Sequence, residues 1–429
     1  MCNLAKNKVM QLTNIYMNSY PKILAAIAGT FLSLVTIDVN SAQAGNFTFT
    51  SIVNVRDNFK DLFGVGGGFP DMNFDVGGGP INDNGTVAFV VNTFQDGQGI
   101  VEGIFTSNGG GAFTTVLKLS PSYSLDGLEI NNSGTVAFGN ISEPQNELLI
   151  SNGENVTTVV TSSDGLSVPS VSSGAFNDSG TLVFGLSKGF DNGAIATGNG
   201  GPLTTVVDTN GLFRFFNQSP AINDANVVAF DATLKDGRSG LFTIKDGTIT
   251  TIADDTSFFL GGFYDYSINN TGTVIFKASL KDGETGIFTG NGEEITTIAD
   301  TSSSFSSFLF NAINDNNQVA FGATLRNGAE NVFNDGIFTG SDPVADKVIA
   351  IGDSLLGGTV TNLLFGDLNN SGQISFLADF KDDSGKTFRG VFRADPVSKS
   401  IPESTSTLGL LAFSALGTGL TLKRKLKQI

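Results

Sequence analysis

Histidine and tryptophan are absent from this 429-residue chain, and cysteine occurs once, as Cys2. Without histidine, neither a Ser-His-Asp triad nor a Cys-His pair can be assembled. A single cysteine also leaves no partner for a disulfide and, with no histidine, no ligand set for an ordinary zinc site. The chemistry that remains belongs to carboxylates, lysine and tyrosine.

Basic residues are also scarce, because 24 lysines and arginines face 41 aspartates and glutamates and leave a net charge of −17. So acidic a chain repels nucleic acid and anionic surfaces, and we expect no nucleic-acid partner. The charge favours solubility of a β-rich protein, and it also leaves open the binding of a cation.

One motif occurs seven times between Ile81 and Phe376, and the segment Ile268–Phe276 is a representative copy. Each copy opens with an asparagine, the repeat asparagine, and has a phenylalanine, the repeat phenylalanine, seven positions later. A period of about 46 residues predicts one supersecondary unit used seven times. The repeat asparagines are Asn82, Asn131, Asn177, Asn223, Asn269, Asn314 and Asn369, and the repeat phenylalanines are Phe89, Phe138, Phe184, Phe230, Phe276, Phe321 and Phe376.

The fourth position of every copy is glycine or asparagine, which tolerate a positive φ most readily. We therefore predict a tight turn with a left-handed residue there, capped by neighbouring Asn, Asp and Ser side chains. The strand after the turn is apolar on both faces, as in Thr86–Phe89, so it is sandwiched between layers. The seven residues at the fourth position are Gly85, Gly134, Gly180, Asn226, Gly272, Asn317 and Gly372.

Further short strands follow, separated by turns such as Lys281-Asp282-Gly283 and Asn291-Gly292 that signal hairpins. Four antiparallel strands in such a period predict an all-β fold, a seven-bladed β-propeller, with an irregular β-solenoid as the alternative. The ends of the repeat region favour the ring. The last copy stops after Gly390–Arg393 without its fourth strand, and Phe49–Val55 resembles that missing strand. We expect this N-terminal strand to close the ring.

Both ends of the chain predict short hydrophobic helices outside the propeller. Lysines near the amino end precede the apolar run Ile23–Ile37 and the sequence Ser41-Ala42-Gln43-Ala44, which predicts a secretory signal peptide, residues 1–44, cleaved between Ala44 and Gly45. The repeat domain is expected at 45–395 and a polar linker at 396–407. Residues 408–429 contain the apolar run Leu408–Leu422 and a basic tail.

The C-terminal segment combines Pro402, Glu403 and Ser404 with that apolar run and the basic tail. This order resembles a PEP-CTERM sorting signal, although Ser404 replaces the usual second proline. The resemblance implies a Gram-negative bacterium, export, and processing by an exosortase, with partners in the export machinery and a link to extracellular polysaccharide. It also implies transient attachment to the membrane through the C-terminal helix, and a final place in the cell envelope, on the cell surface or in the extracellular matrix.

The repeats themselves resemble a tandem family described by an Asn-x-x-Gly-x-x-Ala-Phe motif and found in surface proteins. The copy with Asn131, Gly134, Ala137 and Phe138 matches the motif fully, whereas Asn226 and Asn317 replace the glycine in two others. The resemblance implies an architecture and carries no catalytic residues.

Two kinds of binding residue stand out. Asp83, Asp178, Asp224 and Asp315 occupy the same turn position in four copies, and their hard oxygen ligands suit calcium. Asparagine fills that position in the other copies, however, and capping of the turn explains both residue types. We therefore expect no cofactor, with calcium as the candidate ion.

The second kind is aromatic. One aromatic cluster is Phe213, Phe215 and Phe216, and the other is Phe258, Phe259, Phe263, Tyr264 and Tyr266. These rings can belong to the core, or they can form stacking platforms for sugars at a mouth of the propeller. The absence of tryptophan, the strongest stacking ring, weakens the second interpretation.

With no copy of the repeat that looks catalytic, the sequence favours a non-enzymatic structural or binding module, with exopolysaccharide as its candidate ligand. The alternative is a carboxylate-dependent glycan hydrolase or lyase, which would need two carboxylates facing one cleft.

Overall fold

The computed structural model of the chain describes residues 46–54, 79–95, 98–118, 125–142, 145–162, 167, 171–187, 193–216, 219–328 and 334–397, all within one compact unit, Gln43–Ile429. Every regular element in these ranges is a β-strand. None of the described residues forms a helix that is long and apolar enough to span a membrane. The predicted signal peptide and both predicted terminal helices lie outside the described residues.

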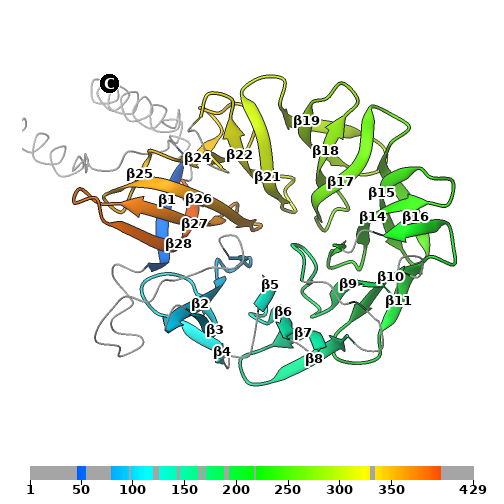
Figure 1. The fold of residues 1–429 in the computed structure, drawn as a ribbon, viewed down its shortest axis with the longest axis horizontal. Coiled ribbons are helices and arrows are strands. Elements are labelled where there is room, and N and C mark those ends of the chain that lie inside the picture. Colours follow the sequence, from blue (N-terminus) through cyan, green and yellow to red (C-terminus); the bar gives the residue numbers. More distant parts are fainter. Residues whose placement is uncertain are drawn as a thin grey trace, which may run out of the picture. The chain divides into compact units, whose positions relative to one another are not determined.

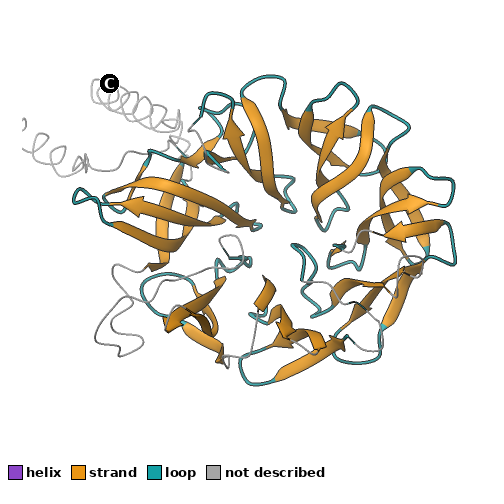
Figure 2. Ribbon diagram, viewed as in Figure 1, coloured by secondary structure: helices purple, strands orange, loops and turns teal. Residues whose placement is uncertain are grey.

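The strands form seven antiparallel sheets arranged around a centre, one for each copy of the repeat (Figures 1 and 2). The predicted seven-bladed β-propeller is thus confirmed. Blade 1 contains β2 (Val87–Gln95), β3 (Gln98–Ser107) and β4 (Thr114–Lys118); blade 2 contains β5 (Leu125–Ile130), β6 (Val136–Ser142), β7 (Gln145–Ser151) and β8 (Val156–Thr161); and blade 3 contains β9 (Leu182–Ser187), β10 (Gly193–Gly198) and β11 (Thr204–Asp208). Blade 4 contains β12 (Phe213–Phe216), β13 (Ala221–Ile222), β14 (Val228–Leu234), β15 (Ser239–Lys245) and β16 (Thr248–Asp254), and blade 5 contains β17 (Phe259–Ile268), β18 (Val274–Leu280), β19 (Thr285–Gly290) and β20 (Ile295–Asp300). Blade 6 contains β21 (Phe305–Ile313), β22 (Val319–Leu325), β23 (Gly336–Phe338) and β24 (Lys347–Ala350), and blade 7 contains β25 (Ser354–Leu355), β26 (Gly358–Leu368), β27 (Ile374–Lys381) and β28 (Thr387–Pro396) with β1 (Phe47–Asn54).

The N-terminal strand β1 closes the ring, as predicted. It pairs antiparallel with β28, with Ser51 opposite Phe392 and Val53 opposite Val391. Ile52 is fully buried in a cluster that also contains residues of the first and last blades. The strand β1 is therefore the outermost strand of blade 7, the one that the last copy of the repeat lacks. The strand β28 ends at Pro396, so the first residue of the predicted linker belongs to the propeller.

The repeat asparagine has two functions, and together they explain why no other residue replaces it. Its side-chain Oδ1 accepts a hydrogen bond from the backbone amide four residues later in all seven copies, which holds the turn closed. Its Nδ2 donates to the backbone carbonyl of the next blade's repeat asparagine, at 2.9 to 3.3 Å. The last of these bonds runs from Asn369 back to Asn82, so the seven form a closed circuit. Aspartate lacks the donor and a hydroxyl is too short, which leaves asparagine.

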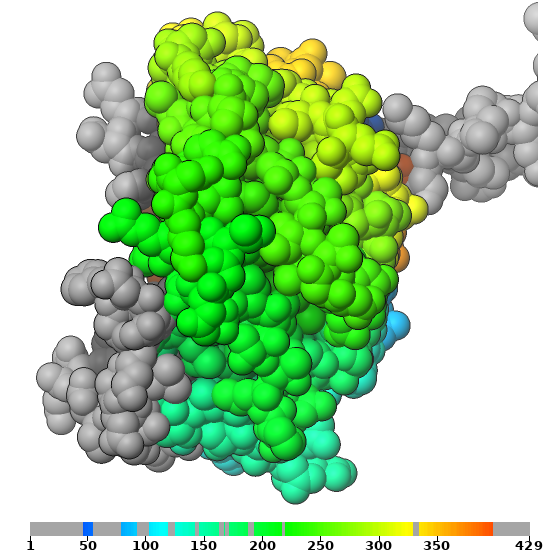
Figure 3. Space-filling model, turned by 90° about the vertical axis from the view of Figure 1, so that its right-hand side faces the viewer, coloured from blue at the N-terminus to red at the C-terminus, as the bar shows by residue number. Residues whose placement is uncertain are grey.

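The fourth residue of each turn has a positive φ in all seven copies, from 57° at Asn226 to 86° at Gly272. The strand that follows is buried on both faces, as its composition predicted. Five of the seven repeat phenylalanines lie opposite a second phenylalanine across the sheet, and three of these pairs are stacked, for example Phe276 on Phe288 at 5.7 Å between ring centroids. Such aromatic pairs stabilise the fold beyond the contribution that the burial of each ring makes. Viewed from the rim, the fourth to sixth blades pack directly against one another (Figure 3).

Candidate ligand site in the central channel

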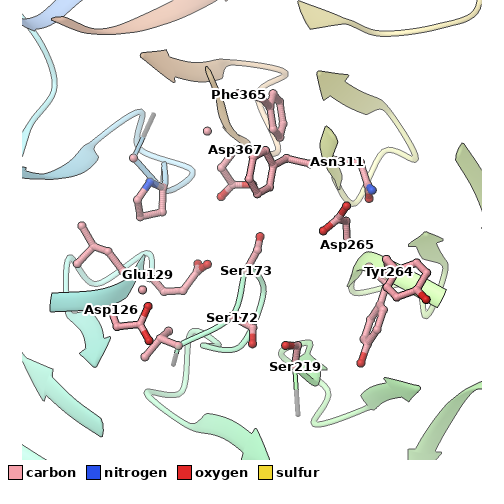
Figure 4. Close-up of a pocket in the computed structure, with 18 of the residues that line it drawn as sticks. Asp126, Glu129, Ser172, Ser173, Ser219, Tyr264, Asp265, Asn311, Phe365 and Asp367 are labelled. Atoms are coloured by element: carbon pink, nitrogen blue, oxygen red, sulfur yellow. The ribbon is translucent and has the colours of Figure 1, made fainter. Parts of the chain in front are cut away.

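The innermost segments of all seven blades surround a cavity of about 570 Å³. This volume lies within the range of roughly 300–1,000 Å³ that is usual for small-molecule sites. The wall combines carboxylates, hydroxyls and aromatic rings, of which ten residues are labelled in Figure 4. The lining residues are Gly79, Pro80, Asp126, Gly127, Leu128, Glu129, Val171, Ser172, Ser173, Ser219, Phe263, Tyr264, Asp265, Tyr266, Phe310, Asn311, Phe365, Gly366 and Asp367.

A second, more polar cavity of about 170 Å³ continues the first toward the repeat asparagines. The two share Glu129, Ser173 and Asp367 as lining residues. Because each inner segment runs from the first cavity to its repeat asparagine in the second, the two follow one another along the axis of the ring. We call them together the central channel.

The calcium candidates lie around the second cavity, in a ring with the asparagines that replace them in other copies. Each backbone amide of the ring donates to the side-chain Oδ1 of the next member at 2.7 to 2.8 Å, and the ring closes from Asn370 to Asp83. Each asparagine Nδ2 also donates to the carboxylates on both sides. We call this the Asp/Asn ring; its members are Asp83, Asn132, Asp178, Asp224, Asn270, Asp315 and Asn370.

These bonds give the four aspartates a structural role. Within the part of the chain that the structure describes, no group of three or more acidic side chains is placed to hold a metal ion. The odd number of blades forces one irregularity. Asp178 and Asp224 are neighbours in the ring, with no asparagine between them.

At the position two residues before each repeat asparagine, two blades differ from the rest. Five blades have an alanine, a serine or a proline at this position, whereas blade 2 has Glu129 and blade 7 has Asp367. Both carboxylates reach from β5 and β26 toward the same part of the channel (Figure 4). The repeat motif did not predict these two residues, because its shared positions begin at the repeat asparagine. The signal was present two residues upstream.

Burial raises the pKa of the Glu129 carboxyl well above its ordinary value, and the charge of Asp367 raises it further. The hydrogen bond that Glu129 accepts from the Gly174 amide, at 3.2 Å, opposes the rise. Burial likewise raises the pKa of Asp367 to about 6, against amide hydrogen bonds from Leu368 and Ile81. The two carboxyls therefore affect each other's ionisation across the channel.

Irregular backbone points further side chains into the first cavity. Three inner strands carry a β-bulge with a left-handed residue four positions before the repeat asparagine: Gly127 in β5, Asp265 in β17 and Phe310 in β21. A positive φ costs glycine little, but it strains aspartate and especially phenylalanine by about 1–3 kcal/mol each. Bulges of this kind re-aim side chains, and all three residues line the cavity. The Asp265 carboxylate pairs with the Lys277 ammonium.

Next to Phe310, Asn311 has an amide without a partner. Only 4% of the residue is exposed, and neither Nδ2 nor Oδ1 makes a hydrogen bond within the described residues. A buried amide left in this state costs about 1–3 kcal/mol. Asn311 also lines the cavity, so a molecule bound beside it is the candidate partner for this amide.

The aromatic clusters divide between the two predicted roles. Phe213 and Phe216, like Phe259 and Phe263, are buried and pack on the repeat phenylalanines Phe230 and Phe276 as core. Tyr264 remains 53% exposed and lines the channel, where it is joined by Phe310 at 44%. Phe215 and Phe258 are exposed away from the cavity lining, and Tyr266 is buried within that lining. The predicted signal cleavage at Ala44 and Gly45 and the sorting motif Pro402, Glu403 and Ser404 lie outside the described residues.

Fold and site together define a seven-bladed β-propeller with a ligand-sized central channel. The profile of a family of unknown function, DUF7453, matches residues 251–399. No curated protein matches the sequence.

Among solved structures, the chain is similar to YCF48 from Cyanidioschyzon merolae, with 14% identity over 80% of this chain and 98% of that one and a TM-score of 0.39. It is also similar to a catalytically inactive virginiamycin B lyase from Staphylococcus aureus solved with quinupristin, with 12% identity, 82% and 100% coverage, and a TM-score of 0.43. The SapL1 lectin in complex with alpha methyl fucoside gives 10% identity, 60% and 89% coverage, and a TM-score of 0.34.

Proposed function

We propose that the protein is an exported, non-enzymatic binding module of a Gram-negative cell envelope or matrix, and that its central channel binds a terminal unit of an exopolysaccharide. The observation that carries the proposal is the cavity of about 570 Å³, with exposed rings of Tyr264 and Phe310 and the partnerless amide of Asn311. Aromatic faces beside a small number of placed polar groups are the composition of small-ligand sites.

Export and sorting belong to the same proposal. The signal peptide 1–44 directs the chain across the inner membrane, and the segment around Pro402 with the apolar run in 408–429 holds it there until an exosortase removes that segment. Mass spectrometry of the protein recovered from its host tests this directly. Termini near Gly45 and Pro402 support the scheme, whereas a mature protein retaining residues 408–429 argues against processing.

A glycan array probed with the purified protein tests the binding function. We expect binding to one class of neutral or basic glycan and loss of that binding in Tyr264→Ala and in Asn311→Leu. The exposed residue Val344, 83% exposed and outside the channel lining, supplies the control substitution Val344→Ala. Uniformly blank arrays would instead support a structural role.

The second candidate is a carboxylate-dependent glycan hydrolase or lyase, favoured by one observation: Glu129 and Asp367 share a cavity and both have raised pKa values. A protonated carboxyl beside an ionised one is the arrangement of general acid and base catalysis. Release of reducing ends from native matrix polysaccharide, abolished in Glu129→Gln, would establish it. Intact polysaccharide after prolonged incubation excludes it.

A further inference from the structure

The walls of the first cavity carry negative charge without matching positive charge. Glu129 and Asp367 lie at its inner end, and the Asp/Asn ring adds four aspartates beyond them. The ion pairs among the described residues link Lys277 to Asp265 and the other basic partners to Asp236, Asp353, Asp379 and Asp395, so none of them neutralises Glu129 or Asp367.

Buried carboxylates are normally paired with a cation, because burial removes the water that would stabilise their charge. Burial raises the pKa of both carboxyls, and no ion pair among the described residues offsets that rise. A divalent metal does not fit well, because calcium takes six to eight oxygens and no described cluster offers three acidic side chains.

The other residues of the first cavity indicate which groups a positively charged ligand carries besides its charge. The partnerless Asn311 amide offers both a donor and an acceptor, which suits hydroxyl groups. The exposed rings of Tyr264 and Phe310 offer faces that attract cations and the C–H side of a sugar ring. Serine hydroxyls at Ser172, Ser173 and Ser219 add further polar contacts.

We infer that the channel binds a ligand with a primary ammonium group, placed between Glu129 and Asp367, and that the ligand is an amino sugar with a free amine. This inference rests on the proposed glycan binding and adds the ligand class: basic glycans bind, N-acetylated ones bind weakly, and anionic ones are excluded. The Asn311 amide and the two rings hold the sugar, and the carboxylates select the ammonium.

Calorimetric titration of the full-length protein with two matched trisaccharides tests the inference. One is a trimer of glucosamine and the other is the same trimer with every amine acetylated, so that they differ in charge and acetyl groups alone. A charged hydrogen-bonded pair contributes enough to make the amine form bind at least about tenfold more tightly. Glu129→Gln and Asp367→Asn should remove that preference, so that each variant binds the amine trimer no more tightly than the acetylated one.

The control Asp282→Asn removes one negative charge from an exposed turn whose only described contact is a cap to Glu284, and should bind as the wild type does. Titration with spermidine distinguishes the two molecules that could supply the ammonium group, an amino sugar and a free polyamine. Spermidine binding that depends on Glu129, with no binding of the trisaccharide, would overturn the amino sugar in favour of a free polyamine.

Equal affinity for both trisaccharides would overturn the ammonium inference and leave the proposed glycan binding intact. Binding of neither would overturn the amino-sugar inference, and the glycan array then decides separately whether the proposed glycan binding holds. Circular dichroism and the urea midpoint of each variant separate lost binding from lost folding.

Discussion

The circuit of repeat asparagines gives the most direct quantitative prediction, at Asn269. Its Nδ2 donates to the Asn314 carbonyl and to Asn317 Oδ1, both at 2.9 Å and both in the next blade. Its Oδ1 accepts from the amides of Thr271 and Thr273 within its own turn. Aspartate can keep the second set of bonds but cannot make the first unless it is protonated.

Each hydrogen bond contributes about 1 kcal/mol net, and a buried partner left unsatisfied costs about 1–3 kcal/mol. Asn269 is 3% exposed, so water cannot replace its bonds. We therefore expect Asn269→Asp to lower the free energy of unfolding by about 2–3 kcal/mol at pH 7, and Asn269→Ala by about 3–4 kcal/mol. The deficit of the aspartate variant should shrink as the pH falls toward 4, because a protonated carboxyl donates to the Asn314 carbonyl.

Equilibrium unfolding in urea measures both variants. Asn291 provides the control in the same blade, since it is exposed and caps only the amides of Glu293 and Glu294. Asn291→Ala should cost less than about 1 kcal/mol. A cost below about 0.5 kcal/mol for Asn269→Asp would refute the inter-blade role of the circuit, since that is the size of an ordinary surface substitution.

Three further predictions follow from the ring and the channel. Ile52→Ala in the closing strand should cost about 2–5 kcal/mol in urea unfolding, as expected for a fully buried isoleucine; a loss under 1 kcal/mol would mean that closure contributes little. Asp367 has a pKa of about 6 in the folded protein, so between about pH 4 and pH 6 the folded state binds more protons than the unfolded state, and the contribution of this carboxyl to stability falls as the pH rises. The free energy of unfolding of Asp367→Asn, relative to that of the wild type, should therefore rise by up to ~3 kcal/mol between pH 4 and pH 8. A difference that does not change with pH would contradict the raised pKa. Asp178→Asn removes the repulsion between the Asp178 and Asp224 carboxylates but also the hydrogen bond from Asn132 Nδ2, so it should change the unfolding free energy by less than about 0.5 kcal/mol, whereas Asp83→Asn, between two asparagines, loses two such bonds and should lower it by about 1–2 kcal/mol; equal losses would show that the order of the ring is irrelevant.

Much of the fold could be predicted from the sequence because its determinants are local. The asparagine, the left-handed fourth residue and the buried strand lie within eight positions of each other, and their physical roles repeat in every copy. The missing fourth strand of the last copy was also visible, since Phe49–Val55 resembles the strand that blade 7 lacks. Closure follows because an unpaired edge on β28 is satisfied by β1.

The candidate site could be predicted only in part. Tyr264 was among the aromatic candidates, but its cluster split into core and channel residues because a bulge at Asp265 interrupts the alternation of the strand. The aspartates proposed for calcium were recognised as equivalent, yet their hydrogen bonding to the next blade depends on how close the turns approach in the ring.

The sequence by itself determined that seven equivalent units would form, because each unit's turn and strand are encoded within that unit. The tertiary structure alone decided that Glu129 and Asp367 share a cavity. They belong to blades 2 and 7, far apart in the chain, and come together because β1 joins the last blade to the first. Their raised pKa values, and with them the chemistry of the channel, arise from burial that exists only once the ring is closed.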